Sequence, residues 1–518
     1  SSFCAFRRPA ARHRRAMSAA PAPPGGRRRS RLRRFGCWGR RCAAQLVAAS
    51  LIAAAVCLSR PWGGPAFACR GALAAPASGR PQPFAGLLEK SGRGVREPRR
   101  PDARAEAAKA TGTAEQAQLS SVSQSSVNLV KNIVGAGMLS LPAGVAAFSG
   151  SPKALVPALS FTLLIGLLSA YGFVLIADAC NRTGETTYQG AWQKTVGPGK
   201  ILPSAACTAK AAIGCISYSM ILGQCLTLIL TPLAEQFGLP AALVSRSSAM
   251  LAVTVGVLLP LCCMKSLAPL AKFSVIGVLS NVYICGFVIL RSFDGSYGRG
   301  GALAAAAPLK AKFLAHPGGA WTTMSDPGFA VLLSILATAF LAHYNAPLFY
   351  EQLAPGPDGK KDGRFLLVSI FGFSAAAALF GVVMAGGFMT FGKNCLGLIL
   401  DNYAVTDLFA TTARLAILVS LITAYPLVFF SLRKQFVMLT GSRGADLAAN
   451  RPRLFTVVLL GIVTTIALNL RDLGRLAAFA GACFGSFLIY VAPALMVLCA
   501  QRKGVGARPT GRGSRIAR

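Results

Sequence analysis

From Gln124 onward, apolar stretches long enough to cross a bilayer recur along the chain, with short polar gaps between most of them. A membrane-spanning helix needs about 20 predominantly apolar residues. On this basis we predict ten spans, over residues 124–148, 154–180, 204–230, 247–263, 270–291, 328–353, 365–391, 408–432, 454–470 and 473–499. The chain is therefore expected to be an all-α integral membrane protein with about ten transmembrane helices. The longest interior gap, residues 292–327, joins five spans to five.

Two of these spans contain residues that disfavour an unbroken helix. The centre of the first span reads Asn-Ile-Val-Gly-Ala-Gly-Met over residues 132–138, and the sixth contains Ala-His-Tyr-Asn-Ala-Pro over residues 342–347. Glycine weakens a helix, and proline removes one of its backbone hydrogen bonds. Paired interruptions at corresponding places in two halves of a chain indicate a substrate site near the middle of the membrane. The pattern therefore favours a solute transporter.

The distribution of basic residues predicts the orientation. The gaps after the second, fourth, sixth and eighth spans carry Lys and Arg, such as Lys194, Lys265, Lys360 and Arg451, whereas the short gaps between them hold few. By the positive-inside rule, these gaps and both termini face the cytosol or an equivalent compartment. The gap 292–327 then faces the other side, because long loops are translocated regardless of their charge.

The net charge of +37 is concentrated near the N-terminus, since 23 of the 54 Lys and Arg precede Thr111. Residues 1–68 form a basic leader, in which the apolar stretch 42–58 and a following Ala-Phe-Ala tripeptide resemble a signal peptide and its cleavage site. Residues 69–120 are rich in Ala and bases and lack apolar periodicity, so we expect them to be disordered. The combination resembles the two-part leader of proteins sent to plastids bounded by extra membranes. The alternative is a retained cytosolic tail.

Several other function classes are excluded by composition and motifs. The basic segment 27–34 lacks interleaved aromatic residues and any groove-reading motif, so we expect no nucleic-acid binding. The 15 cysteines are scattered without Cys-x-x-Cys spacing, which indicates packing residues and no metal site beyond a possible Na⁺ site. No nucleophile elbow, phosphate loop or metal-binding box appears. We therefore expect no enzyme and no cofactor, apart from Na⁺ or H⁺ as a coupling ion.

A family resemblance is carried by several motifs in order. Residues 128–142, with the sequence Asn-Leu-Val-Lys-Asn-Ile-Val-Gly-Ala-Gly-Met-Leu-Ser-Leu-Pro, resemble the first-helix signature of the amino acid/auxin permease family. Three further blocks, residues 273–281, 339–347 and 420–427, resemble the fifth, sixth and eighth helices of that family. Together with Phe-Gly-Ser at 484–486, the resemblance covers residues 122–498, and the recurrence of motifs in register makes it specific.

The resemblance implies a LeuT-like fold, in which two five-helix repeats of inverted topology are built around broken helices 1 and 6. It also implies amino acid transport coupled to a cation. The transmembrane amino acid transporter domain would occupy residues 121–500, followed by a basic tail over residues 501–518. Members of the family usually carry an eleventh helix, which that tail is too short to form.

The two interruptions predict a substrate site. An amino acid inside a bilayer needs donors for its carboxylate and acceptors for its ammonium group. Opening the first span frees backbone N–H groups at the positive end of the following half-helix, and the second places polar side chains at membrane depth, where such groups are usually functional. The alternatives are that the glycines only let another helix pack closely and that the histidine is a packing residue. The predicted substrate-binding residues are Asn132, Gly135, Ala136, Gly137, His343, Tyr344 and Asn345.

An ion site is predicted beside the first break. The family resemblance aligns Thr423 with a threonine that faces this break and completes a sodium site, and Ser420 is a second hydroxyl one turn away. A backbone carbonyl at the break, that of Ile133, would add a further oxygen. The alternative is that each hydroxyl bonds back to its own helix. No carboxylate lies deep in any predicted span, so sodium is favoured over a proton as the coupling ion.

We therefore predict a secondary active transporter that moves amino acids by alternating access, with an amino acid and membrane lipid as its partners. The alternative is an amino acid sensor on the same scaffold, for which a long soluble tail with linear motifs would be the signal. The predicted location is a multi-pass membrane protein in a plastid envelope or another secretory-derived membrane, or otherwise in a vacuolar or plasma membrane.

Overall fold

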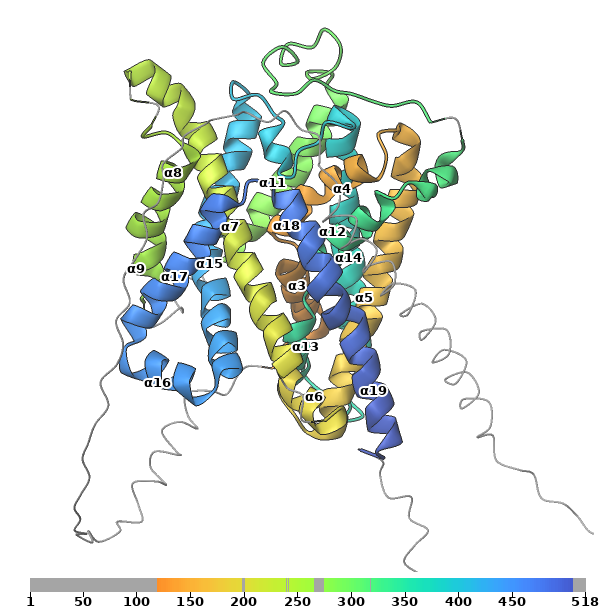
Figure 1. Cartoon of the computed structure of the whole chain (residues 1–518). Coiled ribbons are helices and arrows are strands. Elements are labelled where there is room, and N and C mark those ends of the chain that lie inside the picture. Colours follow the sequence, from red (N-terminus) through yellow and green to blue (C-terminus); the bar gives the residue numbers. More distant parts are fainter. Residues whose placement is uncertain are drawn as a thin grey trace, which may run out of the picture. The chain divides into compact units, whose positions relative to one another are not determined.

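The computed structural model describes residues 119–197, 201–238, 240, 242–264, 274–316 and 318–505, and these residues are almost entirely helical (Figure 1). The predicted leader, residues 1–68, nearly all of the predicted disordered segment 69–120 and most of the tail 501–518 lie outside the described residues. The chain is an all-helical membrane protein, as the hydrophobic pattern predicts.

Within the described part, eight helices are long and apolar enough to cross a membrane, and a ninth span is formed by a bent pair of helices. The predicted fourth span corresponds to a shorter apolar helix, Arg246–Cys262, which contains one π-helical turn, Thr254–Leu258. Nine of the ten predicted spans thus meet the criteria of length and composition, and the fourth falls short in length.

The helices follow the predicted order. Their bounds are α3 Val122–Ile133, α4 Leu141–Phe148, α5 Leu155–Thr183, α6 Tyr188–Thr195, α7 Ile201–Phe237, α8 Arg246–Val253, α9 Leu259–Cys262, α11 Ser274–Phe293, α12 Phe329–Ala339, α13 Ala346–Gln352, α14 Asp362–Phe391, α15 Leu408–Thr440, α16 Ser442–Asn450, α17 Pro452–Asn469, α18 Leu473–Ala480 and α19 Ala492–Arg502. The last two are joined by π-helical turns into one span, Leu473–Arg502.

The first span is broken where the sequence predicts. α3 ends at Ile133, a 3₁₀ turn η1 covers Ala136–Ser140, and α4 continues at an angle of 47°. Two glycines stand in this stretch, and glycine is among the weakest helix formers. Pro142 lies in the first turn of α4, where its missing N–H costs nothing, so it favours a new helix start rather than a continuous one.

The sixth span is interrupted in the same manner. α12 ends at Ala339, residues 340–342 are not helical, and a 3₁₀ turn η5 covers His343–Asn345 before α13 begins. Pro347 occupies the first turn of α13, as Pro142 does in α4. The predicted break of helix 6 is therefore present in the backbone hydrogen bonding, although the span as a whole is not bent as sharply as the first.

The two interrupted spans run antiparallel and touch at both ends. The backbone of Ser120, before α3, pairs with the end of α13 through hydrogen bonds of 2.8 Å to Gln352 O and 3.0 Å from Ala354 N. At the opposite end, Gly328 packs so closely on the backbone of Ala147 that a Cβ would not fit. This arrangement places the two breaks side by side in the middle of the bundle.

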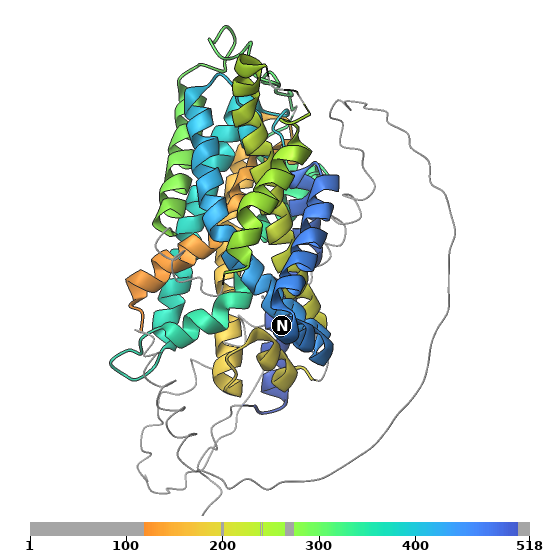
Figure 2. The ribbon, with the colours of Figure 1, turned by 90° about the vertical axis from the view of Figure 1, so that its left-hand side faces the viewer.

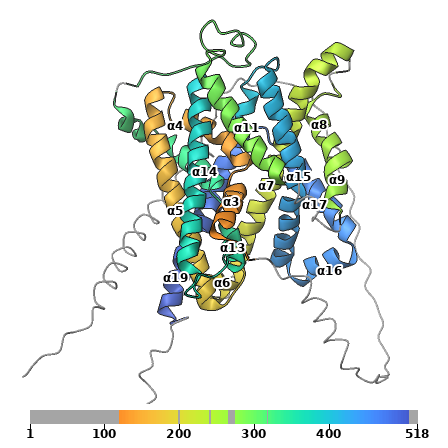
Figure 3. The same cartoon turned by 180° about the vertical axis from the view of Figure 1, so that it is seen from behind.

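The gaps between spans sort to two ends of the bundle. α6 and α16, which follow the second and eighth spans, lie at one end, and the long loop after α11 lies at the other (Figures 1 and 2). Seen from behind, α3 lies between α14 and α7 (Figure 3), and α14 packs against both α3 and α5. The second half of the broken span, α4, is almost entirely buried, whereas α3 buries only Ser125, Leu129 and Ile133.

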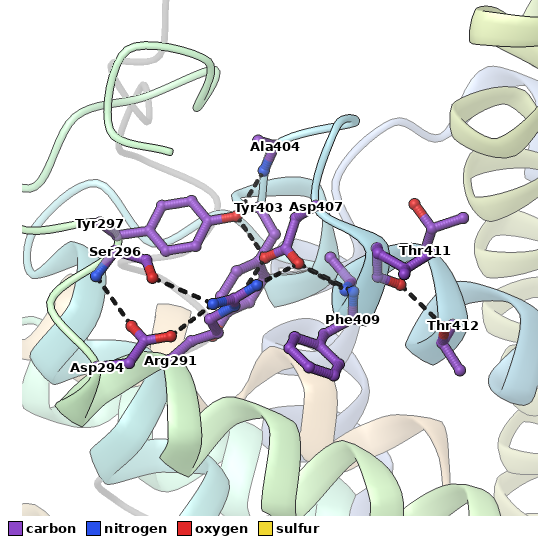
Figure 4. Close-up of polar contacts among 12 residues, drawn as sticks. Arg291, Asp294, Ser296, Tyr297, Tyr403, Ala404, Asp407, Phe409, Thr411 and Thr412 are labelled. Carbon is purple, nitrogen blue, oxygen red and sulfur yellow. Dashed lines mark hydrogen bonds and ion pairs between the residues drawn. The ribbon is translucent and has the colours of Figure 1, made fainter. Parts of the chain in front are cut away.

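A polar network ties α11 to α15 at the end that carries the long loop (Figure 4). Arg291 of α11 donates two bonds to Asp407, from Nη2 to Oδ1 at 2.6 Å and from Nε to Oδ2 at 2.9 Å. Tyr297 donates a hydrogen bond of 2.8 Å to the same carboxylate, whose Oδ1 also accepts from the Phe409 amide and so caps α15. Burial favours the neutral carboxyl, but hydrogen bonds from Arg291 and Tyr297 outweigh it and hold the pKa of Asp407 below its ordinary value.

Candidate functional site

A cavity lies between the two breaks. It has a volume of about 340 Å³ and is lined by both interrupted spans together with α7, α11, α15 and α18. That volume is within the range of about 300–1,000 Å³ that is usual for small-molecule sites. Of the ten residues predicted to bind substrate or ion, eight line it: Asn132, Ile133, Gly135, Ala136, Gly137, Tyr344, Ser420 and Thr423.

The break in the first span leaves backbone amides free. The last ladder bond of α3 runs from Val134 N to Val130 O at 2.7 Å, and the next amide with a backbone partner is that of Met138, which donates to Gly135 O at 3.2 Å. Within the described residues, the amides of Gly135, Ala136 and Gly137 have no backbone acceptor. They lie at the N-terminal end of the segment that continues into α4, where the helix dipole favours an anion.

Contacts between the breaks fix their separation. Asn345 Nδ2 donates a hydrogen bond of 3.0 Å to Asn132 Oδ1. A Cβ on Gly137 would lie 3.4 Å from the Cα of Ala339, the last residue of α12. The Asn132 oxygen thus joins the two spans and keeps a second lone pair for another donor. The glycine lets the backbone of α12 approach the first break closely.

The structure separates the three polar residues of the second break. Tyr344 lines the cavity, whereas Asn345 contacts Asn132 and does not line it. His343 is fully buried on the far side of the span, where its Nε2 lies 2.9 Å from Ser169 O of α5 and its ring packs edge-on against Phe173. The geometry therefore resembles the packing histidine that the sequence left as the alternative.

The predicted ion ligands come together at the cavity wall. Thr423 Oγ1 donates back to its own helix, at 2.9 Å from Ser420 O and 3.1 Å from Val419 O. A hydroxyl has one proton and two lone pairs, so this bond leaves an oxygen lone pair for a cation. The Ser420 hydroxyl has no hydrogen-bond partner among the residues that the structure describes. The position of Thr423 is therefore compatible both with a sodium ligand and with a hydroxyl that only bonds back to its own helix.

Several polar residues of the cavity were not predicted from the sequence. Asn281 of α11 donates a hydrogen bond of 3.0 Å to Val134 O, which holds one carbonyl of the first break. Tyr218 of α7 has its hydroxyl 3.7 Å from where a Cβ on Gly135 would be. Lys210, also of α7, lines the cavity with Lys131 of α3. Each was visible as a polar residue inside an apolar run, which is the signal for a functional residue.

The electrostatics of the cavity suit a carboxylate. Lys131 and Lys210 both line it, and none of the described residues that line it is Asp or Glu. A concave, weakly polar site with one sign of charge concentrates the opposite charge. The free amides and the two lysines therefore favour an anionic group, and an accompanying ammonium would depend on carbonyl and hydroxyl oxygens.

Comparison with known proteins gives one family match. The family model described as "Transmembrane amino acid transporter protein" matches residues 118–504. This range includes both interrupted spans and every residue that lines the cavity.

Individual relatives are distant but cover most of the chain. The "Putative sodium-coupled neutral amino acid transporter 11" of Danio rerio is 26% identical over 380 residues, which are 73% of this chain and 79% of the relative. "Solute carrier family 38 member 8" of Homo sapiens is 24% identical over 74% of this chain and 85% of its own length. "Vacuolar amino acid transporter 2" of Saccharomyces cerevisiae is 23% identical over 72% and 75%.

Proposed function

The chain belongs to the transmembrane amino acid transporter family, and we propose that it is a secondary active transporter that moves an amino acid across its membrane by alternating access. The observation that carries the proposal is the cavity of about 340 Å³ between two interrupted spans, whose lining includes the free amides of the first break and two lysines. The family membership confirms the resemblance to the amino acid/auxin permeases, and it excludes an enzyme.

The mechanism that we propose uses a LeuT-like five-plus-five inverted repeat. The first and sixth spans run antiparallel, each is interrupted near its middle, and each resumes with a proline in the first turn of the second segment. Those are the features expected when two halves of opposite topology share a site at their interface. Spans one, two, six and seven would rock against the others around the two breaks.

Transport is tested by uptake of radiolabelled L-amino acids into liposomes that contain the purified protein, with the sodium and pH gradients varied separately. Accumulation of at least one amino acid above the level of protein-free liposomes, driven by one of the two gradients, is the expected result. Binding without any accumulation under either gradient would contradict transport and favour the amino acid sensor, which remains the second candidate.

For the substrate, we propose that its carboxylate binds the amides of Gly135, Ala136 and Gly137, with Tyr344 close by. His343 and Asn345 then act by packing and by joining the two spans, because neither lines the cavity. Asn132 lines the cavity and accepts one hydrogen bond from Asn345, so its oxygen both joins the two spans and has a second lone pair for the ammonium group.

For the coupling ion, we propose Na⁺, bound by oxygen atoms of Thr423, Ser420 and Ile133. Hard cations prefer oxygen ligands, and one relative is described as sodium-coupled. Thr423→Val keeps the shape of the side chain and removes one oxygen. We expect it to raise the sodium concentration for half-maximal uptake about tenfold, the effect of losing one charge-assisted contact of about 1.5 kcal/mol.

The matched control for Thr423 is Thr412→Val, in the same helix but outside the cavity, where the hydroxyl also bonds back to its own helix. An unchanged sodium dependence in Thr423→Val would show that Thr423 does not bind sodium and that its hydroxyl only bonds back to its own helix. Uptake that is driven by a proton gradient and is indifferent to sodium would overturn the sodium site as a whole.

For the location, we propose a plastid envelope or another secretory-derived membrane. The relatives include a vacuolar transporter by name, so a vacuolar membrane is the alternative. Residues 17–109 fused to a fluorescent protein are expected to direct it to a plastid in the native cell type. N-terminal sequencing of the mature protein gives a second check, because retention of residues 27–34 would show an uncleaved tail and contradict the leader.

A further inference from the structure

Two lysines line the cavity between the two breaks, and both are half-buried. Lys131 comes nine residues after the start of α3, and Lys210 comes nine residues after the start of α7. A helix rises about 1.5 Å per residue, so each lysine stands about 14 Å along its helix from the first residue. On the predicted orientation both helices begin at the cytosolic end, which carries α6 (Figure 1). Neither lysine therefore belongs to the helix end that faces the cytosol.

Both lysines lack a partner of opposite charge. Within the described ranges, neither Lys131 nor Lys210 makes an ion pair or a hydrogen bond, and none of the described residues that line the cavity with them is Asp or Glu. An ammonium group inside a membrane protein is costly unless it is paired, and such groups usually mark the path of a substrate or ion. The two lysines therefore call for an anionic ligand.

The charge balance of the cavity disfavours a neutral amino acid. The free amides of the first break already provide for one carboxylate, that of the amino acid backbone. A neutral amino acid carries no net charge, so both lysines would keep their charges uncompensated, and a bound Na⁺ would add a third positive charge. An amino acid with a second carboxylate brings a net charge of −1 and compensates one of them.

The cavity extends along α7 from the first break to Lys210. The residues of α7 that line it fall on one face of the helix over about two turns: Lys210, Ala211, Ile213, Gly214, Ser217 and Tyr218. The Tyr218 hydroxyl lies 3.7 Å from the position of a Cβ on Gly135, so this end of the face is beside the free amides. Three of the four lining residues between Lys210 and Tyr218 are Ala, Gly or Ser, which occupy little space. A ligand at the amides therefore has room to extend toward Lys210.

We propose that the cavity takes an acidic amino acid and that Lys210 determines this specificity by binding the side-chain carboxylate. The backbone carboxylate binds the amides of residues 135–137, and the ammonium group meets Asn132 Oδ1. Lys131, in the last turn of α3, adds to the positive potential around the second carboxylate.

The length of the site favours L-glutamate over the shorter L-aspartate. Lys210 precedes Tyr218 by eight residues, which correspond to about 12 Å along the helix, so the ligand and the lysine side chain must together cover most of that distance. The inference rests on the proposed function, because the acidic amino acid occupies the same site as the transported substrate.

The test is the selectivity between L-glutamate and its neutral isostere L-glutamine. Initial rates of uptake of each radiolabelled amino acid into liposomes that contain the purified protein are measured over a range of concentrations, under the gradient that drives uptake. We expect the half-maximal concentration for L-glutamate to be about tenfold lower or more, since the amide of L-glutamine cannot form the charge-assisted bond to Lys210. L-aspartate should lie between the two.

Three variants assign the selectivity to Lys210. Lys210→Met keeps the apolar stem and removes the charge, so the ratio of the two half-maximal concentrations should fall to near one. Lys210→Arg keeps the charge and should keep the preference for L-glutamate. The matched control is Lys434→Met in α15, which removes an exposed lysine that does not line the cavity, and it should have the wild-type ratio.

Two results would overturn the inference. One is a wild type that accumulates L-glutamine in preference to L-glutamate, which leaves the proposed function intact and needs no variant. The other is a preference for L-glutamate that is undiminished in Lys210→Met, which would show that this lysine only extends toward cytosolic water. Failure of every amino acid to accumulate in the wild type would instead contradict the proposed function.

Discussion

Replacement of Gly137 by valine is expected to reduce uptake to about a hundredth of the wild-type level. The Cβ of a side chain at this position would lie 3.4 Å from Ala339 Cα, so the methyl groups beyond it meet the backbone of α12 or fill the space beside the free amides. Overpacking of this kind costs about 1–3 kcal/mol, which is one to two factors of ten in affinity. The measurement is the initial rate of uptake into liposomes, together with thermal stabilisation by the amino acid.

Two control variants accompany the Gly137→Val prediction. Gly137→Ala places its only new atom at ordinary contact distance, so it should keep most of the uptake. Gly461→Val, in α17, adds the same side chain where no neighbouring atom lies within 4 Å, and should behave as the wild type. Normal uptake by Gly137→Val would move the substrate site away from the first break.

Removal of Arg291 is expected to cause the largest loss of stability. The Asp407 side chain has 0% of its surface exposed and its main partner is Arg291. Breaking a buried ion pair by removing one partner leaves an uncompensated charge and costs about 3–5 kcal/mol. Arg291→Met should therefore lower the free energy of unfolding by that amount, measured by denaturant titration in detergent micelles.

The double variant Arg291→Met, Asp407→Asn is the matched control. It has no buried charge left unpaired and keeps a good capping residue for α15, so it should regain more than half of the loss. A double variant no more stable than Arg291→Met would show that the loss has another cause, such as altered packing of Arg291 against Phe409.

The pH dependence of this network follows from the lowered pKa values of Asp407 and Asp294. A carboxyl whose pKa is lower in the folded state stabilises the fold above its ordinary pKa, about 3.9, and that contribution is lost as the pH falls through the folded value. The wild type should therefore lose stability in acid. In Arg291→Met, protonation of Asp407 relieves the unpaired charge, so the deficit of the variant should shrink over the same range.

Much of the fold followed from the sequence because the membrane imposes it. Backbone groups in lipid must be satisfied within a helix, so long apolar runs predict spans with few alternatives. The fourth span was the least well predicted, since residues 247–263 form a shorter helix with a π-helical turn. The 47° bend between Ile133 and Ala136 was located correctly, because two nearby glycines weaken the helix there and Pro142 favours a new helix start just beyond them.

The site was harder to predict, since it depends on which face of a helix a residue occupies. His343 and Tyr344 are neighbours in the sequence, yet one packs against α5 and the other lines the cavity. Lys210 lies inside α7, which begins at Ile201, and it lines the cavity, a position that the sequence pattern alone does not give. Asn281 lies in a motif that the sequence did identify, but its contact with the first break depends on tertiary packing.

The most direct test of the substrate site is a cryo-EM structure of the purified protein with the amino acid that the uptake measurements identify. We expect ligand density between the two breaks, with the carboxylate about 3 Å from the amides of Gly135, Ala136 and Gly137 and the side chain beside Tyr344. A structure with ligand bound elsewhere, or with a continuous helix through residues 133–138, would contradict the account.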